Sequence, residues 1–421
     1  MQIVFYSVVL NQHQAPVADL LWELTQHNYV FVELKQSAEN KGGTEDYSNR
    51  PYLLRAWESQ SKKAKAMELA MTADCCVFAG IESLPFEKER LKRGLLSFEM
   101  GERWLKYGFK SLASPRLLKW LMAYYLGGWG KKPLYKLCCS AFCKLDHKKL
   151  KTFDEKCYKW GYFTKVNETI EIEAPCDFSS SDTIHTLMWC ARFLKLKHPE
   201  LPVLLAEKLK RKGFQFRLDM YGSGEMEEQT KQLATQLGVL DVVTFHGAVT
   251  NNIIHEAMRK AEIFLFTSDR HEGWGAVANE SLSESCVLVA SDAIGSSPYL
   301  ISDGINGFMF KSSKSSCSFD NPDRKALDSI YKKVEYLLTH PQECKQMQHN
   351  AEVVIKQMWS PDVAAKRFLA LVQELKNGNE TPFLSDPAQK HRYNEEIIAN
   401  KYLYNTVHWP YSTTNRRKSY I

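Results

Sequence analysis

The sequence predicts an α/β protein of two domains, each with a parallel β-sheet covered by helices on both faces. Three observations support this fold class. The chain has 421 residues, which suits two domains with complete hydrophobic cores. Short apolar runs typical of buried strands alternate with segments of helical periodicity at intervals of about 20 to 30 residues. Polar and glycine-rich clusters follow many of the predicted strands, where parallel sheets bind their ligands.

The second half of the chain shows this alternation most clearly. Strands are predicted there at 186–190, 214–221, 242–245, 263–266, 287–290 and 307–310. Helices are predicted at 199–212, 225–237, 253–260 and 276–284, and again from 323 to about 375. Because strand and helix alternate, we expect right-handed crossovers and a parallel sheet.

The first half has a weaker pattern of the same kind. Strands are predicted at 3–9, 29–34 and 75–79, and helices at 16–25, 62–72 and 116–129. Glu, Pro, Ser and Asp gather at 165–182, which suggests the link between domains. We therefore expect an N-terminal domain at 1–170, a second domain at 171–376, and an extension at 377–421 that partly crosses back to the first domain.

The composition favours a cytoplasmic protein with reduced thiols. The chain has 11 Cys, an odd number, with neighbours such as Cys75 and Cys76 and without C-x-x-C or zinc-ligand spacing. The apolar segment 1–10 has no preceding Lys or Arg and no cleavage site, so it predicts a buried strand instead of a signal peptide. No apolar run is long enough to span a bilayer.

The sharpest motif is H-E-G-W-G-A-V-A-N-E at 271–280. Glu272 and Glu280 stand eight positions apart, separated by a glycine-containing turn that opens a helix. Gly273 and Gly275 let a ligand approach the backbone, and free N–H groups at a helix start attract an anion. Two carboxylates so placed can bind hydroxyls at opposite ends of one extended polar ligand. The competing interpretation is a capped helix with exposed Glu side chains.

This motif resembles the E-x7-E signature of retaining glycosyltransferases of the GT-B fold, of the glycosyltransferase family 4 type. The surrounding blocks also fit, namely F-L-F-T-S at 264–268, V-L-V-A-S-D at 287–292 and G-I-N-G at 304–307. The resemblance covers 184–310 well and the first half only in general character. It implies two Rossmann-like α/β/α domains that face each other across a cleft, with a nucleotide-sugar donor on the second domain.

The resemblance also implies roles for individual residues. Glu272 would contact the donor sugar, and Glu280 would bind the ribose hydroxyls. An Arg followed five residues later by a Lys forms the phosphate grip of this family, and Arg192 and Lys197 match it, with Lys195 as the weaker rival. A guanidinium and an ammonium would neutralise a pyrophosphate and stabilise it as a leaving group.

Other donor-binding candidates come from three glycine-containing blocks. They are Gly273, Trp274 and Gly275, then Gly222 and Gly224 of Y-G-S-G, and His246, Gly247 and Val249 of F-H-G-A-V. For His246 a structural hydrogen bond at a strand end is favoured over a catalytic role. No D-x-D motif occurs, so the sequence requires no metal, and the nucleotide sugar is a co-substrate instead of a cofactor.

Residues of the first domain are candidates for orienting the acceptor hydroxyl. His13 follows the first strand, Glu82 follows the strand at 75–79, and Glu99 and Glu102 follow the apolar residues 95–98. A surface or helix-cap position explains each of them equally well. We take His13 and Glu99 as the catalytic candidates from this domain.

The expected activity is therefore retaining transfer of a sugar, of the hexosyltransferase type, to a glycan or lipid-linked saccharide. UDP is the first expectation for the donor nucleotide, with GDP as the alternative. The blocks N-K-G-G-T-E-D-Y and M-W-C-A-R-F resemble capsule or lipopolysaccharide enzymes of gut bacteria. Two alternatives stay open: a non-catalytic GT-B-like protein that binds a nucleotide sugar or glycan, and another GT-B reaction, such as that of an epimerase or a phosphorylase.

The basic charge is unevenly placed. Residues 86–165 hold 19 Lys and Arg against 7 Asp and Glu. One interpretation is peripheral contact with the inner face of the cell membrane through 103–151, which would bring a lipid-linked acceptor to the enzyme. The other is an ordinary helix with solvated Lys side chains. Because no recognised nucleic-acid-binding module occurs, we do not expect a nucleic-acid partner.

Overall fold

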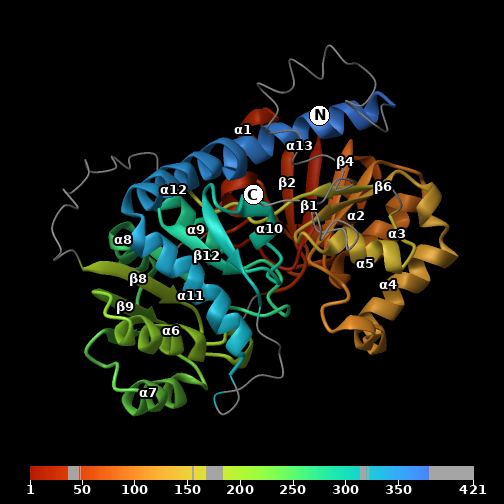
Figure 1. Cartoon of the computed structure of the whole chain (residues 1–421). Coiled ribbons are helices and arrows are strands. Elements are labelled where there is room, and N and C mark those ends of the chain that lie inside the picture. Colours follow the sequence, from red (N-terminus) through yellow and green to blue (C-terminus); the bar gives the residue numbers. More distant parts are fainter. Residues whose placement is uncertain are drawn as a thin grey trace, which may run out of the picture.

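The computed structural model describes residues 1–36, 47, 49–153, 156–166, 184–312, 319 and 322–378. These residues form two parallel sheets flanked by helices, one in each half of the chain (Figure 1). The predicted α/β class and two-domain Rossmann-like architecture are confirmed. Most of the expected domain link at 165–182 lies outside the described residues, as does the expected extension from residue 379 onward.

The first domain contains a seven-stranded sheet in the order β3-β2-β1-β4-β5-β6-β7, with all neighbours parallel. Its strands are β1 Ile3–Ser7, β2 Tyr29–Glu33, β3 Leu53–Arg55, β4 Cys75–Ala79, β5 Ser97–Gly101, β6 Leu134–Cys138 and β7 Cys157–Lys159. Its helices are α1 Ala15–Leu24, α2 Gln60–Thr72, α3 Leu84–Lys92, α4 Pro115–Leu126 and α5 Cys143–Lys149. Helix α4 ends before the predicted boundary because Gly127 and Gly128 follow it, and Gly128 adopts a left-handed conformation.

The second domain contains a six-stranded parallel sheet in the order β10-β9-β8-β11-β12-β13. Its strands are β8 His185–Cys190, β9 Phe216–Tyr221, β10 Val243–Gly247, β11 Ile263–Phe266, β12 Val287–Ser291 and β13 Gly307–Phe310. Its helices are α6 Glu200–Arg211, α7 Glu227–Gln236, α8 Asn251–Lys260, α9 Val277–Ser283, α10 Ser297–Leu300, α11 Arg324–Thr339 and α12 Pro341–Val354.

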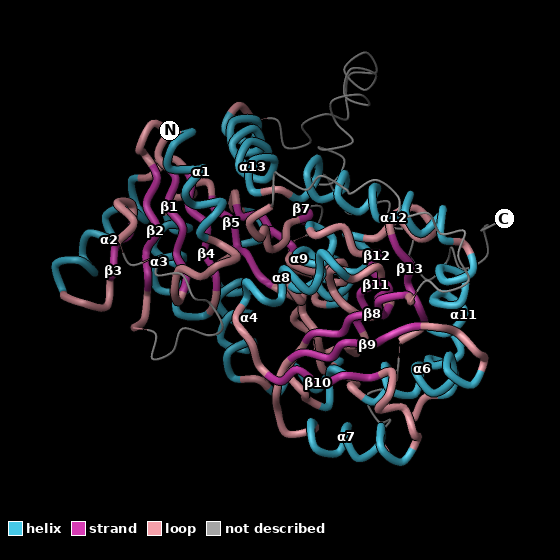
Figure 2. Tube along the Cα trace, turned by 90° about the vertical axis from the view of Figure 1, so that its left-hand side faces the viewer, coloured by secondary structure: helices cyan, strands magenta, loops and turns pink. Residues whose placement is uncertain are grey.

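The last described helix, α13 Pro361–Lys376, returns to the first domain and packs against α1 (Figures 1 and 2). A π-helical turn at Ile355–Trp359 precedes it, and the Ser360 hydroxyl caps its first turn. Phe368 is fully buried, with its ring centroid 5.7 Å from that of Phe5 and 5.5 Å from that of Phe98. The range 171–376 thus includes a helix whose packing partners belong to the first domain.

The two domains share one continuous hydrophobic core, because aromatic residues from both meet at the junction. Trp274 of the second domain is fully buried and contacts the rings of Tyr162, Tyr299 and Trp359. A Cβ atom at Gly161 would lie 2.3 Å from the Trp274 ring, so only a glycine leaves room for the indole. This close packing fixes the loop of residues 271–280 against the first domain.

Candidate functional site

The predicted donor-side residues gather at one edge of the second sheet. Arg192 and Lys197 follow β8, and Glu272 follows β11, while Glu280 lies on α9. Strands β8 and β11 are neighbours in the sheet, although β9 and β10 lie between them along the chain. Strand order reverses at this point, and such switch points form the crevices in which open α/β sheets bind ligands.

Lys197 and Glu272 form an ion pair across this switch point. The Ser268 hydroxyl donates a hydrogen bond of 3.1 Å to the Glu272 carboxylate. The Thr267 hydroxyl donates one of 2.7 Å to the carbonyl of Lys197, which ties the two loops together. Both side chains of the pair are mostly buried, 13% and 14% exposed. The cation and the carboxylate are therefore already positioned, and they neutralise each other in the absence of a ligand.

Glu280 is a second carboxylate at the same edge of the sheet. Burial is the largest cause that raises its pKa; the nearby Glu284 raises it further, and His255 offsets part of the effect. Among the described residues its carboxylate has no hydrogen-bond or ion-pair partner. Burial, and secondarily the charge of Glu280, also raise the pKa of Cys190 to about 12, and Lys197 partly opposes this. The Cys190 thiol is thus within electrostatic range of both Glu280 and Lys197.

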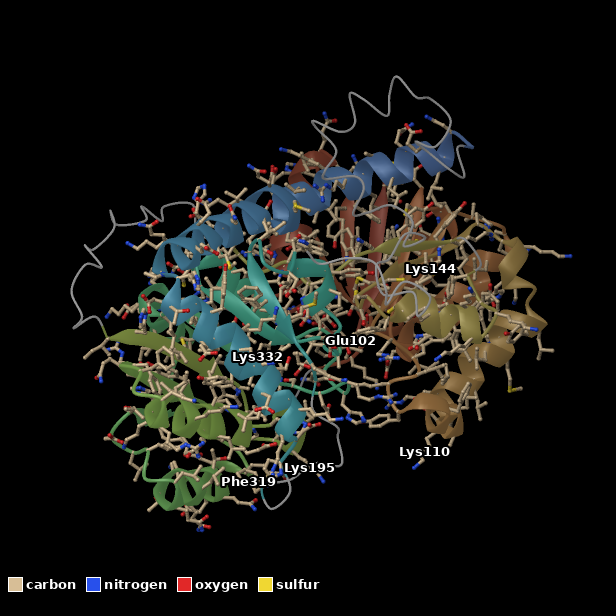
Figure 3. The ribbon with its side chains drawn as sticks, viewed as in Figure 1. Glu102, Lys110, Lys144, Lys195, Phe319 and Lys332 are labelled. Carbon is tan, nitrogen blue, oxygen red and sulfur yellow. The ribbon has the colours of Figure 1, made fainter. Side chains whose placement is uncertain are left out.

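Arg192 completes the donor-side cluster as an exposed cation. Within the described part of the chain its guanidinium forms no hydrogen bond and no ion pair. Lys195, its weaker-ranked neighbour, is also exposed and lies at the lower edge of the second domain in Figure 3. The three cations after β8 therefore differ in setting, because only Lys197 is held by a carboxylate.

Gly222 and Gly224 serve a packing role that the sequence did not predict. Their φ angles are +122° and +152°, and a Cβ atom at either would lie 2.0 Å from the Ala191 carbonyl oxygen or 2.6 Å from that of Phe193. The Phe193 N–H donates a hydrogen bond of 2.9 Å to the Ser223 carbonyl. These glycines let the loop after β9 lie directly on the loop that carries Arg192, so they position the cluster by backbone contact.

The glycines of the 271–280 loop have equally specific neighbours. A Cβ atom at Gly273 would lie 1.6 Å from the carboxylate of Glu102, and one at Gly275 would lie 2.2 Å from the Phe266 ring. Trp274 corrects our prediction: its side chain is fully buried, and its indole N–H donates to Asn279, 2.8 Å away. The indole fills the domain junction and is not available to a donor.

His246 has the structural role that was favoured for it. Its Nε2 lies 2.7 Å from an Asp219 carboxylate oxygen, and its ring stacks on Tyr221 with centroids 4.3 Å apart. The carbonyl of Gly247 accepts a hydrogen bond of 2.8 Å from the Gly222 N–H, and Gly247 has a φ of +69°. Val249 is half-buried against the shared hydrophobic core. The backbone at the end of β10 thus lies beside the loop after β9.

On the first domain, Glu102 and not Glu99 faces the second domain. Glu99 is buried in an ion pair with Lys136, the residue directly opposite it on β6. Glu102 lies between the two domains in Figure 3, against Gly273, and accepts a hydrogen bond of 3.0 Å from the Tyr162 hydroxyl. Burial is the main cause that raises the pKa of Glu102. The position of Glu99 therefore argues against the acceptor role that we assigned to it.

His13 lies beside the same junction. Its ring stacks on Tyr162 with centroids 5.6 Å apart, and burial lowers its pKa to about 4. Its Nδ1 is buried and has no hydrogen-bond partner among the described residues. His13 is therefore neutral at physiological pH and retains an unused ring nitrogen. Next to it, the Gln12 side chain accepts a hydrogen bond of 3.4 Å from Asn251 of the second domain.

Sequence reasoning missed one buried charged network behind Lys197. His198 is 1% exposed, and its Nδ1 lies 2.7 Å from Glu200, while its Nε2 lies 3.8 Å from Asp269. Burial alone would lower the pKa of His198, but Asp269 and Glu200 outweigh it and raise the pKa to about 9. Asp269 also accepts a hydrogen bond of 2.8 Å from the backbone of His271. The network thus supports the residues on both sides of Glu272.

Within the described residues, no three His, Cys, Asp or Glu side chains are arranged to hold a metal ion. No helix there is long and apolar enough to cross a membrane.

Comparisons with known proteins identify the second domain. Residues 180–354 match the family model for glycosyl transferases group 1. A putative glycosyltransferase EpsF of Bacillus subtilis is 33% identical over 104 residues, which are 25% of this chain and 26% of the relative. A D-inositol 3-phosphate glycosyltransferase of Streptomyces griseus is 35% identical over 89 residues, 21% of this chain and 18% of the relative. The chain thus spans about a quarter or less of the length of these curated relatives.

Solved structures establish the fold over most of the chain. The lipopolysaccharide outer core galactosyltransferase WaaB, in its apo form, has a TM-score of 0.64 and 14% identity, covering 89% of this chain and 100% of that one. Anabaena HepE, in complex with UDP and glucose, has a TM-score of 0.60, 14% identity and the same coverage. The predicted GT-B arrangement of two Rossmann-like domains is thereby confirmed.

Proposed function

We propose that this protein is a retaining glycosyltransferase of the family 4 type that transfers a sugar from a nucleotide-sugar donor to a glycan or lipid-linked acceptor. The observation that carries the proposal is the cluster at the β8/β11 switch point. It combines an ion pair between Lys197 and Glu272 with a cation at Arg192 and a carboxylate at Glu280 that have no side-chain partner among the described residues. The family match of residues 180–354 supports the same activity.

The cluster suits the three parts of a nucleotide sugar. The pyrophosphate would bind to Arg192 and Lys197, whose charges stabilise it as it leaves. Glu280 would accept hydrogen bonds from the ribose hydroxyls, because a largely buried carboxylate without a partner is an open acceptor. Glu272 would contact the donor sugar. Donor binding then has to separate Glu272 from Lys197, so that the phosphate replaces the carboxylate beside the ammonium.

The acceptor would approach from the first domain. Glu102 and the neutral His13 lie on that side of the junction, near Tyr162, which contacts both. Burial lowers the pKa of His13 to about 4, so its imidazole is a weak base at neutral pH, and the Glu102 carboxylate already accepts a hydrogen bond from Tyr162. We therefore infer front-face displacement, in which the leaving phosphate itself takes the proton of the acceptor hydroxyl, and the sugar keeps its anomeric configuration. His13 would orient the acceptor from this side of the junction.

UDP is the first choice for the donor nucleotide, with GDP as the alternative. HepE, which shares the fold, was solved with UDP and with UDP-glucose. WaaB, which shares the fold, is a lipopolysaccharide outer core galactosyltransferase, and this supports a hexosyl transfer in capsule or lipopolysaccharide synthesis. We place that reaction in the cytoplasm, at the inner face of the cell membrane, without a required metal or cofactor.

The test is calorimetric titration of UDP and GDP, with and without a sugar, into wild type and single variants. Arg192→Ala and Lys197→Ala each remove a cation from the diphosphate, and we expect affinity to fall about tenfold or more. Glu280→Ala is expected to weaken the binding of every nucleotide that contains a ribose. Lys195→Ala is the matched control, because this exposed Lys lies two residues away from Lys197 and is expected to change affinity less than about twofold.

Two outcomes would overturn the assignment. If Lys195→Ala weakens binding more than Lys197→Ala, the phosphate grip is misplaced. If nucleotide sugars bind but no acceptor and no water ever receives the sugar, the protein is a non-catalytic GT-B-like binding partner. The assay that distinguishes a transferase from such a partner is the release of free nucleotide from a UDP-sugar. It is measured over hours, with and without lipid-linked saccharides extracted from membranes.

A further inference from the structure

Helix α4 leaves an apolar stripe uncovered. Leu118, Met122, Tyr125 and Leu126 are 45%, 60%, 54% and 84% exposed, and their spacing places them on one face of the helix. The opposite face is buried, since Trp120 and Tyr124 belong to the aromatic core of the first domain. Most soluble surfaces scatter single large apolar residues, whereas these four are contiguous. The outer face of α4 therefore exposes apolar area that the described fold does not cover.

Four lysines near this stripe have no acidic partner among the described residues. Lys88 on α3, Lys119 on α4, and Lys131 and Lys132 after it form no ion pair with any described residue. In the whole segment 103–151 the one acidic residue is Asp146, which is fully buried and paired with Arg103. Lys92 on α3 differs, because it pairs with the exposed Glu89, but the surface around the stripe is cationic overall.

A trough of about 830 Å³ runs between α3 and α4, beside the stripe. Apolar side chains form its floor, namely Leu91, Leu118, Met122, Leu126 and Trp129. Lysine side chains form its rim, namely Lys88, Lys92, Lys119 and Lys132. An occupant with an apolar body and an anionic head matches both parts. Acyl chains carrying phosphate headgroups have this chemistry.

The same segment reaches the candidate site. The Tyr107 ring packs on His271 with centroids 4.8 Å apart, and the Arg270 Nε donates a hydrogen bond of 3.3 Å to the carbonyl of Lys106. Phe109 and Lys110, which follow, are exposed, and Lys110 lies at the lower tip of the first domain in Figure 3. Residues 106–107, which precede α4 in the same cationic segment, therefore contact the loop that carries Glu272.

We propose that the α3–α4 surface is a docking site for an anionic phospholipid bilayer, with α4 lying in the headgroup region and Leu118, Met122 and Leu126 inserted. The inference deepens the proposed function, because it adds the surface from which a lipid-linked acceptor reaches the site. A protein partner fits less well, since lysine is depleted in the cores of protein interfaces, whereas basic amphipathic helices favour anionic membranes.

The test is sedimentation of the full chain with vesicles of phosphatidylcholine alone or with phosphatidylglycerol added. Wild type is expected to bind the anionic vesicles, to bind the neutral ones at least tenfold more weakly, and to dissociate at high salt. Met122→Glu is expected to reduce binding about tenfold, because it places a carboxylate in the inserted stripe. Lys119→Glu is expected to reduce binding at least fivefold on anionic vesicles only.

Controls lie on the second domain. Leu240→Glu replaces a Leu that is 53% exposed, and Lys332→Glu replaces an exposed Lys of α11, and neither is expected to change vesicle binding. Equal loss in control and α4 variants would overturn the proposal, as would absence of wild-type binding to anionic vesicles. A dimer in vesicle-free solution that Met122→Glu dissociates would identify a second copy as the occupant instead.

The outcome is separable from that of the proposed function. UDP titration of Met122→Glu and Lys119→Glu is expected to match wild type, since neither residue contacts the switch-point cluster. Vesicle binding by a protein that fails to bind any nucleotide would refute the transferase and leave the membrane surface standing. Nucleotide binding without vesicle binding would refute the membrane surface and leave the transferase standing.

Discussion

Gly161→Ala is expected to destabilise the protein because the domain junction has no room for a methyl group. The new Cβ would lie 2.3 Å and 2.6 Å from two atoms of the Trp274 ring and 2.9 Å from the ring of Trp359. The indole cannot retreat, since its N–H is bound to Asn279, which in turn donates a hydrogen bond of 3.1 Å to the carbonyl of Tyr162. The backbone at Gly161 is not left-handed, so strain comes from the contact alone.

We expect a loss of about 1–3 kcal/mol in the free energy of unfolding, the usual cost of overpacking a rigid core, measured by urea denaturation. Gly101→Ala is the matched control, because its Cβ would meet its nearest neighbour at an ordinary 3.4 Å. In the Gly161→Ala background, Trp274→Phe is expected to cost at least about 1 kcal/mol less than in wild type, since the smaller ring makes space. Wild-type stability of Gly161→Ala, or strictly additive costs, would refute the packing of Trp274 against Gly161.

Three further predictions concern buried groups. Glu280→Gln is expected to raise the stability of the ligand-free protein, because burial raises the pKa of this carboxylate, and to weaken UDP binding about tenfold. Glu284→Gln breaks ion pairs and is expected to lower the free energy of unfolding by about 2 kcal/mol. Urea denaturation measures the stabilities, and calorimetry measures UDP binding. The folded pKa of His198 is raised from 6.5 to about 9, so it contributes up to about 3 kcal/mol that is complete below pH 6.5 and is lost as pH rises through 9. Urea denaturation between pH 6 and 9.5 is expected to lose this slope in His198→Gln, and an unchanged slope would contradict the assignment. Phe368→Ala is expected to lower the free energy of unfolding by about 3–5 kcal/mol. Lys376→Ala removes one partner of a half-exposed ion pair and is expected to lower it by less than about 1 kcal/mol. Similar losses for the two variants would argue against the packing of α13.

The sequence predicted the second domain well because its strands are short apolar runs bounded by turn residues. The strands at Ile263–Phe266 and Gly307–Phe310 have the predicted bounds, and β4 at Cys75–Ala79 does as well. The strands that were missed break this pattern. Strand β6 carries Lys136 within it, and β3 and β7 have only three residues each. A buried Lys is hidden from any pattern based on hydrophobicity, because its acceptability depends on a partner from another strand.

The candidate site could be predicted where one loop carries the functional residues. The prediction failed where a residue from another element determines the surroundings of a side chain. Glu272 and Glu280 lie in one loop and the helix that it opens, so both fall at one edge of the sheet. Glu99 failed because alternation along β5 turns it away from Phe98 and Met100 and toward Lys136 on β6. Trp274 failed because the residue that makes space for it, Gly161, lies more than a hundred positions earlier. Contacts at such separation leave no local signal.

The return of α13 also has a consequence for how the chain matures on the ribosome. The first sheet is synthesised early, yet the ring that covers Phe5 and Phe98 belongs to Phe368, which emerges only after the whole second domain. Domains usually fold in order as they leave the ribosome. Here the earliest strands receive the last part of their apolar cover from the latest helix, so the first domain completes its core only after the second domain has been synthesised.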